Sequence, residues 1–304
     1  MRSTVKSTVA FQGTGLHSGR PLRARICPTA AGTGIVFRRT DVKQGQGDIP
    51  ARFDHVTDTM LCTRLSNAEG VSIGTVEHLM AALAACGVSD ALIMIDGPEV
   101  PIMDGSAAPF VRGILGAGLK ALPGSRQALK VVSPVEVVDG DRIARLVPAE
   151  RFQMSFLIDF PDPAIGRQIL ARDLVGPAVV HELSDCRTFG RLSDGEALRL
   201  AGLARGASLE NAVIVDGGRI LNSAGLRRAD EFVRHKMLDA VGDLALAGAP
   251  IIGRFEGVRG GHEMTNRLLH ALFGRPLAFR RVEAAADQVP ATGALTLERT
   301  RLAV

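Results

Sequence analysis

The chain has neither tryptophan nor tyrosine among its 304 residues, and its aromatic side chains are 12 phenylalanines. The core must therefore rest on Leu, Val, Ile and Ala. The sequence also lacks an uninterrupted apolar run of about 20 residues, the length that a helix needs to cross a bilayer. No stable membrane insertion is expected. The N-terminus, which carries Arg2 and Lys6, does not have the pattern of a signal peptide.

Cysteine and clustered charge are scarce as well. The four cysteines lie far apart and form no Cys-x-x-Cys pair, which argues against a thiolate zinc site and a disulfide framework. The net charge of +4 comes from scattered basic residues, so nucleic-acid binding is not expected, whereas an anionic small substrate is. No coiled-coil heptad is present. These features indicate a soluble, cytoplasmic protein with reduced thiols, and a monomer.

Alternating apolar residues and helical spacing predict two similar α+β domains, 1–122 and 126–304, joined by a Pro-Gly linker at 122–125. The predicted strands are 5–11, 21–26, 34–38 and 91–95 in the first half, and 129–138, 143–148, 153–160 and 250–253 in the second. The predicted helices are 75–85, 106–119, 230–247 and one that begins at residue 262. The stretch around 160–215 has no counterpart in the first half and is predicted to be an insert.

A near-repeat links the two halves. Glu77-His78-Leu79-Met80 in a first-half helix corresponds to Arg234-His235-Lys236-Met237 in a second-half helix, and a strand and a further helix follow each. If the halves fold alike and pack about a pseudo-two-fold axis, His78 and His235 would meet between them. A bound metal ion is the expected reason for such a meeting.

The helix predicted at 230–247 carries His235, Asp239 and Asp243 at positions i, i+4 and i+8, which lie on one face. Imidazole and carboxylate are zinc ligands, and His78 could supply the third protein ligand of a catalytic site. The alternative is a solvated face stabilised by salt bridges between its charged residues. Spacing alone leaves both interpretations open.

Two further residues suit acid–base chemistry. Glu77 adjoins His78 and could accept a proton from water at a metal, although a helix-start carboxylate stabilised by the helix dipole is the simpler interpretation. His262 starts a helix, and within reach of Asp243 it suits a general acid. The segment 262–266 differs from the metallopeptidase motif His-Glu-x-x-His because Asn266 replaces the second histidine. The other histidines are predicted to be structural or exposed: His17, His55, His181 and His270.

Seven motifs follow one another along the chain: 13–19 (GTGLHSG), 58–63 (DTMLCT), 75–79 (TVEHL), 101–110 (PIMDGSAAPF), 187–190 (RTFG), 231–239 (EFVRHKMLD) and 261–262 (GH). In this order they resemble the UDP-3-O-acyl-N-acetylglucosamine deacetylases of lipid A biosynthesis, over nearly the whole chain. The resemblance implies two α+β domains, each with an insert, packed as a β-α-α-β sandwich. The implied substrate is a UDP-linked acylated amino sugar, whose acetamide is hydrolysed.

The resemblance also implies roles for individual residues. One zinc ion per chain would bind His78, His235 and Asp239. Glu77 would be the general base, and His262, paired with Asp243, the general acid. Lys236 and Thr188 would stabilise the negative charge that develops on the carbonyl oxygen.

The implied substrate contacts lie elsewhere in the second half and in one loop of the first. Asp159 and Phe160 would hold the uracil, and Arg259 stands where many relatives have lysine near the diphosphate. Phe189 and Leu61 would line the sugar and the start of the acyl chain, with core packing as the alternative for both. Arg191 and Arg205 differ from the residues expected in the acyl passage, so the preferred acyl length is left open.

Two other functions compete with this one. The first is a zinc amidohydrolase that acts on a different N-acetylated substrate. It would share the metal site but would not need Phe160 or Arg259. The second is a non-enzymatic protein that binds nucleotide-sugar lipids. The presence of every expected catalytic residue argues against it.

Overall fold

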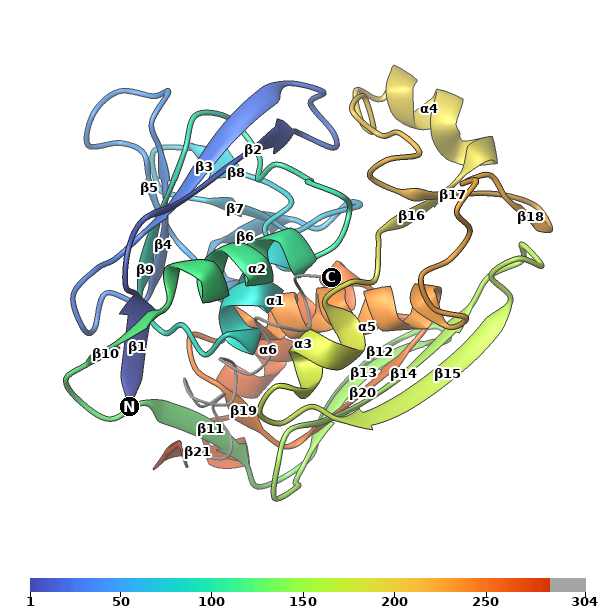
Figure 1. Cartoon of the computed structure of the whole chain (residues 1–304). Coiled ribbons are helices and arrows are strands. Elements are labelled where there is room, and N and C mark those ends of the chain that lie inside the picture. The colour runs from blue at the N-terminus through green and yellow to red at the C-terminus, as the bar shows by residue number, and fades with distance from the viewer. Residues whose placement is uncertain (285–304) are drawn as a thin grey trace.

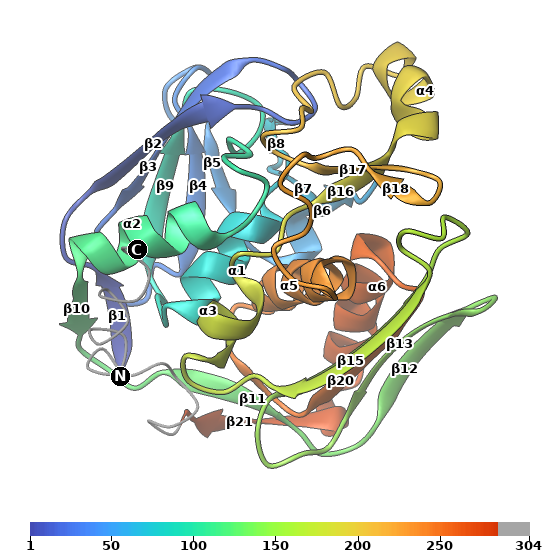
Figure 2. The same ribbon diagram turned by 45° about the vertical axis from the view of Figure 1, so that its right-hand side comes forward.

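Two five-stranded sheets form outer layers, and four helices lie between them (Figure 1, Figure 2). The structure is a computed structural model that describes residues 1–284. The first sheet has the order β2 (Val9–Thr14), β3 (Pro21–Cys27), β9 (Ala91–Ile95), β4 (Ile35–Arg39) and β5 (Asp48–Pro50). The second has the order β12 (Val135–Asp139), β13 (Arg142–Val147), β20 (Arg254–Val258), β14 (Gln153–Asp159) and β15 (Arg167–Asp173). The helices between them are α1 (Glu77–Ala85), α2 (Ala108–Ala117), α5 (Glu231–Ala245) and α6 (His262–Phe273).

The two sheets share one topology. In each, the central strand pairs parallel with one neighbour, β9 with β4 and β20 with β14, and the other pairs are antiparallel. One helix precedes the central strand and one follows it in both halves. The predicted α+β fold with two similar halves is therefore confirmed. The division at 122–126 remains a prediction.

Smaller elements make up the rest of residues 1–284. Four small sheets have the orders β1 (Arg2–Val5) and β10 (Leu119–Leu122); β19 (Ile251–Ile252), β11 (Gln127–Val131) and β21 (Phe279–Glu283); β6 (Val56–Asp58), β7 (Arg64–Ser66) and β8 (Ser72–Ile73); and β16 (Phe189–Arg191), β17 (Val213–Asp216) and β18 (Arg219–Ile220). The short helices are η1 (Phe53–His55), α3 (Ala178–Leu183), η2 (Leu192–Asp194), α4 (Gly195–Leu200) and η3 (Pro276–Ala278). Strands β6 to β8 lie in the chain between β5 and α1, and α3 to β18 lie between β15 and α5. Each half thus carries an insert at the corresponding place.

Helices α1 and α5 pack directly against each other at the centre of the molecule. The contact is close because Gly242 of α5 has no side chain: a Cβ there would collide with the main-chain oxygen of Glu77. Glycine inside a helix costs about 1 kcal/mol relative to alanine, so its presence here serves the close approach. Buried Leu79 and Leu83 of α1 and Leu238 of α5 belong to the surrounding apolar core.

Several predicted boundaries were wrong. The strand predicted at 5–11 is two strands, β1 and β2, and the one at 129–138 is also two, β11 and β12, separated at Pro134, which has no N–H to donate to a ladder. The helix predicted at 106–119 spans only Ala108–Ala117, because Gly118 takes a φ of 75° and the chain continues as β10.

The segment expected as an insert at 160–215 begins with a strand of the main sheet, since β15 pairs with β14 along its length. The part outside the repeat starts after Asp173 and extends to Ile220.

Within residues 1–284, every helix is too short or too polar to cross a membrane. Residues 1–284 contain no disulfide, and three of their four cysteines are buried.

Candidate metal centre and active site

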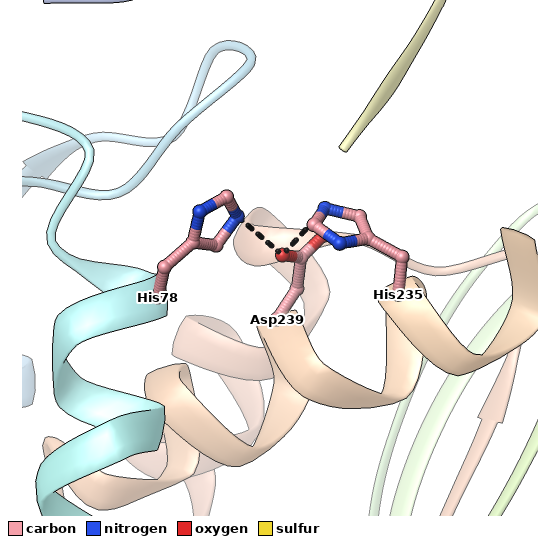
Figure 3. Close-up of side chains that lie close together, drawn as sticks. All are labelled: His78, His235 and Asp239. Atoms are coloured by element: carbon pink, nitrogen blue, oxygen red, sulfur yellow. Dashed lines mark ion pairs between the residues drawn. The ribbon is translucent and has the colours of Figure 1, made fainter. Parts of the chain in front are cut away.

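Three buried side chains converge where α1 meets α5: His78 from α1, and His235 and Asp239 from consecutive turns of α5 (Figure 3). His78 Nε2 lies 3.4 Å and His235 Nε2 3.2 Å from Asp239 Oδ1, and each residue offers a ligand atom within 4.8 Å of the others. Among the described residues, no hydrogen-bond donor reaches the buried Asp239 Oδ1. Leaving such an atom without a partner is costly, so these residues fit a metal ion.

The protonation of these groups also suits metal binding. Burial lowers the pKa of His235 to about 4, which keeps the imidazole neutral. Burial raises the pKa of Asp239, but nearby His235 and Lys236 more than offset this and hold it well below its usual value. A neutral imidazole and an ionised carboxylate are the forms that bind a metal.

A main-chain carbonyl orients His235. Its Nδ1 lies 3.0 Å from the Cys186 oxygen, and because a carbonyl only accepts, Nδ1 carries the proton. Nε2 then carries no proton, and its lone pair is available to bind a metal ion next to Asp239 Oδ1. A hydrogen bond from the second ring nitrogen to a carbonyl is the kind of contact that fixes the tautomer of metal-bound histidines.

Lys236 lies beside the three ligands. Its Nζ donates a hydrogen bond of 2.8 Å to Asp239 Oδ2. Burial lowers the pKa of Lys236, but Asp239, Asp243 and Glu77 together raise it by more, so the net shift is upward and the side chain remains a cation. A fixed positive charge therefore borders the centre.

Glu77 is the first residue of α1 and is almost fully buried. Its Oε2 accepts a hydrogen bond of 3.0 Å from the Thr63 main-chain N–H. Burial raises the pKa of this carboxyl. A buried carboxylate with a raised pKa is a better proton acceptor near neutral pH than an exposed one.

His262, the first residue of α6, and Asp243 of α5 form a buried pair, in which His262 Nδ1 donates to Asp243 Oδ2 at 2.8 Å. Burial lowers the pKa of His262, but the charge and hydrogen bond of Asp243 more than offset this, and the pKa rises to about 9. Glu77 also contributes to the rise. The His262 imidazole and the Glu77 carboxyl are thus close enough to affect each other's pKa.

Thr188 lies in a segment that is fixed on both sides. Its N–H donates to Gly105 of the first half at 2.8 Å. The preceding residue, Arg187, forms a buried ion pair with Glu231 at the start of α5, with a nitrogen–oxygen distance of 2.9 Å. Phe189, which follows, lies 6.2 Å from the His235 ring, measured between ring centroids. Thr188 is therefore held in a fixed segment beside Phe189, which packs near His235.

We expect Glu231→Ala to lower the free energy of unfolding by about 3–5 kcal/mol, because it leaves the buried Arg187 guanidinium without its carboxylate. Glu231 also accepts hydrogen bonds from the N–H groups of Arg187 and Arg227. Urea denaturation measures the effect. The control is Asp48→Ala, whose ion pair with Arg38 is nearly half exposed and contributes at most about 1 kcal/mol. Equal losses in the two variants would contradict the prediction.

Of the residues predicted to contact substrate, four make contacts that involve one another or neighbouring acidic groups, and the fifth, Leu61, lies in a loop. Phe160 and Phe189 meet edge to face at 5.5 Å between ring centroids. Arg259 Nη1 lies 3.4 Å from Asp159 Oδ2 and 3.1 Å from Asp141 Oδ2. Leu61 is on the loop between β6 and β7, half exposed and with a φ of 63°.

Four features were not identified from the sequence: the Thr63 hydroxyl, the Cys186 carbonyl, the Arg187–Glu231 ion pair and the hydrogen bond of His17 to the second-half insert. His17 was expected to be structural or exposed. It is buried, and its Nδ1 accepts from the Ala204 N–H of the second-half insert. The motifs at 13–19, 58–63, 187–190 and 231–239 contain His17, Thr63, Arg187 and Glu231, but the partners of these residues lie elsewhere in the sequence. In contrast, Asn266 has a structural role, since its amide donates to the Phe53 oxygen.

Arg191, one of the two unusual residues of the insert, is bound to acidic groups. Its Nε lies 2.6 Å from Asp162 Oδ2, and its Nη1 lies 3.6 Å from Asp194 Oδ1. The other, Arg205, donates its N–H to the His17 main-chain oxygen.

Comparison with known proteins agrees with this arrangement. The sequence profile of the family described as UDP-3-O-acyl N-acetylglycosamine deacetylase (LpxC) matches residues 2–274. A UDP-3-O-acyl-N-acetylglucosamine deacetylase of Phenylobacterium zucineum is 52% identical over 277 residues, which cover 91% of this chain and 94% of that protein. A protein of the same name from Photobacterium profundum is 44% identical over 291 residues, 95% of each chain. A third protein of that name, from Pasteurella multocida, is 45% identical over 278 residues, 91% of each chain. Since these matches extend over nearly all of both partners, the chain belongs to the UDP-3-O-acyl-N-acetylglucosamine deacetylase family.

Proposed function

We propose that this protein is a zinc-dependent amide hydrolase that removes the acetyl group of UDP-3-O-(3-hydroxyacyl)-N-acetylglucosamine. The products are acetate and the free 2-amine, and the reaction is the committed step of lipid A biosynthesis. The observation that carries the proposal is the convergence of His78, His235 and Asp239 beside a buried base and a buried acid. The printed names of the relatives support the choice of substrate.

His78 Nε2, His235 Nε2 and Asp239 Oδ1 would hold one zinc ion per chain. Two imidazoles and one carboxylate are a donor set of catalytic zinc sites, in which a position stays open for water or substrate. When bound, the zinc ion supplies a Lewis acid that polarises the amide carbonyl and makes water more acidic.

Glu77 and His262 would move the protons. Glu77 takes a proton from the attacking water as the water oxygen bonds to the acetamide carbon. The carbon–nitrogen bond then breaks, and His262 protonates the departing amine. His262 can do so because Asp243 keeps it cationic at neutral pH. Acetate leaves with the oxygen that came from water.

Lys236 and Thr188 would stabilise the negative charge that develops on the former carbonyl oxygen. Lys236 provides a fixed ammonium, which Asp239 holds in place. Thr188 would provide a hydroxyl donor from a segment anchored at Gly105 and Glu231. Donors held in position before the reaction are effective because they need no reorganisation.

The remaining residues would bind the substrate. Phe160 would stack on the uracil beside Asp159, and Arg259 would face the diphosphate. Its guanidinium already lies within reach of Asp159. Phe189 and Leu61 would line the sugar and the start of the acyl chain. We expect a cytoplasmic monomer that neither inserts stably into membranes nor binds nucleic acid.

Mass spectrometry of the purified enzyme with this substrate tests the proposal. We expect loss of one acetyl group, abolished by a zinc chelator and restored by added zinc. Simple N-acetylated sugars serve as the comparison and should remain intact. If they are deacetylated instead, while the UDP-linked substrate of a zinc-loaded enzyme is untouched, the chain is a zinc amidohydrolase for a different N-acetylated substrate.

A further inference from the structure

Thr63 lies between the two buried carboxylates of the site. It follows the half-exposed loop of residues 59–61 and directly precedes β7, and it is itself only 2% exposed. Its main-chain oxygen accepts a hydrogen bond from the Val76 N–H at 3.4 Å. The residue is therefore fixed against the start of α1.

Each polar donor of Thr63 contacts a different carboxylate. Its N–H donates to Glu77 Oε2 at 3.0 Å, and its hydroxyl donates to Asp243 Oδ1 at 2.6 Å. Glu77 belongs to α1 of the first half, and Asp243 to α5 of the second. One residue thus joins the candidate base to the partner of the candidate acid.

The hydroxyl completes the hydrogen bonding of Asp243. Thr63 occupies Oδ1, and His262 Nδ1 occupies Oδ2. A buried carboxylate with a donor on each oxygen has a fixed orientation, and hydrogen bonds to charged groups in a low-dielectric interior are strong. The orientation of the His262 ring therefore depends on a chain of contacts that begins at Thr63.

We propose that Thr63 is a positioning residue of the reaction. It fixes the Glu77 and Asp243 carboxylates relative to each other, and through Asp243 it acts on proton delivery by His262. This inference rests on the proposed function. It makes no use of the metal, so metal content serves as an independent check that the centre is intact.

Two variants of Thr63 separate the hydroxyl from the rest of the side chain. Thr63→Val keeps the shape and the N–H to Glu77 but removes the donor to Asp243, whereas Thr63→Ser keeps both donors. We expect Thr63→Val to lower kcat about tenfold to a hundredfold, the range for a lost hydrogen bond to a charged group. KM should change less than about threefold, zinc content should be unchanged, and Thr63→Ser should stay within about threefold of the parent in kcat.

A double-mutant cycle with Asp243→Asn shows whether Thr63 acts through Asp243. We expect Thr63→Val to cause less than about a twofold further loss of kcat in the Asp243→Asn background. An equal loss in both backgrounds, an unchanged kcat in Thr63→Val, or a Thr63→Ser variant as impaired as Thr63→Val would each overturn the inference.

The proposed function fails in a different way. If Asp243→Asn and His262→Gln retain full turnover, the acid assignment falls, and the role of Thr63 falls with it. If both are impaired while Thr63→Val is normal, only the role of Thr63 is lost.

Discussion

Replacing Glu77 with glutamine is expected to lower kcat by about 10²–10⁴-fold, the usual contribution of a positioned general base. The amide cannot accept the proton of the attacking water. Its oxygen can still accept the Thr63 N–H that now reaches Glu77 Oε2, so the local structure should persist. Single-turnover deacetylation measured by mass spectrometry gives the rate, and metal analysis of the same sample shows whether zinc remains.

The control for this variant is Glu69→Gln, at an exposed turn of the first half. It should match the parent enzyme. If Glu77→Gln retains near-normal turnover with full zinc content, Glu77 is not the base. If zinc is lost, the lower turnover reports on the metal centre instead of the base, a result that the cluster of His78, His235 and Asp239 does not predict because it does not include Glu77.

Replacing His262 with glutamine is expected to cost a similar factor in kcat, about 10²–10⁴-fold. The variant loses the cation that protonates the departing amine. The matched control is His270→Gln on the same helix, because His270 is exposed and contacts Phe53 outside the candidate site. Normal turnover in His262→Gln, or a comparable loss in His270→Gln, would contradict the assignment.

The pH dependence gives an independent measure of the same group. His262 must be protonated to act as an acid, so kcat/KM should fall as the pH rises through the pKa of His262, about 9. Asp243 raises that pKa by its charge and its hydrogen bond, against the effect of burial. Asp243→Asn removes the charge, so the pKa of His262 drops and the alkaline limb moves to lower pH. A limb that stays in place in Asp243→Asn would show that another group titrates there.

Local patterns predicted the secondary structure best where apolar spacing was regular. The helix of residues 75–85 and the strand at 91–95 lie where expected, since period and length agree with the structure. The strand predicted at 129–138 failed because apolar residues on both sides of Pro134 concealed a break. The insert was misjudged for a different reason: β15 belongs to the main sheet through pairing with β14, and a local pattern does not reveal which strand will be its neighbour.

The candidate metal ligands were foreseeable because two signals coincided. His235 and Asp239 lie one helical turn apart, and His78 occupies the matching place in the repeat. The meeting of His78 with the other two nevertheless required the close packing of α1 and α5, which Gly242 permits. No local pattern identifies that contact, because it joins segments far apart in the chain.

The order of residues was enough to establish the two similar halves, the helix face with His235, Asp239 and Asp243, and the family. These follow from spacing and from motif order, which can be read along the chain. The folded arrangement was needed to learn that Thr63 donates to both Glu77 and Asp243 and that Cys186 orients His235. These contacts depend on burial and on the relative placement of distant segments. The same arrangement shifts two pKa values: burial raises that of Glu77, and Asp243 raises that of His262 against the effect of burial.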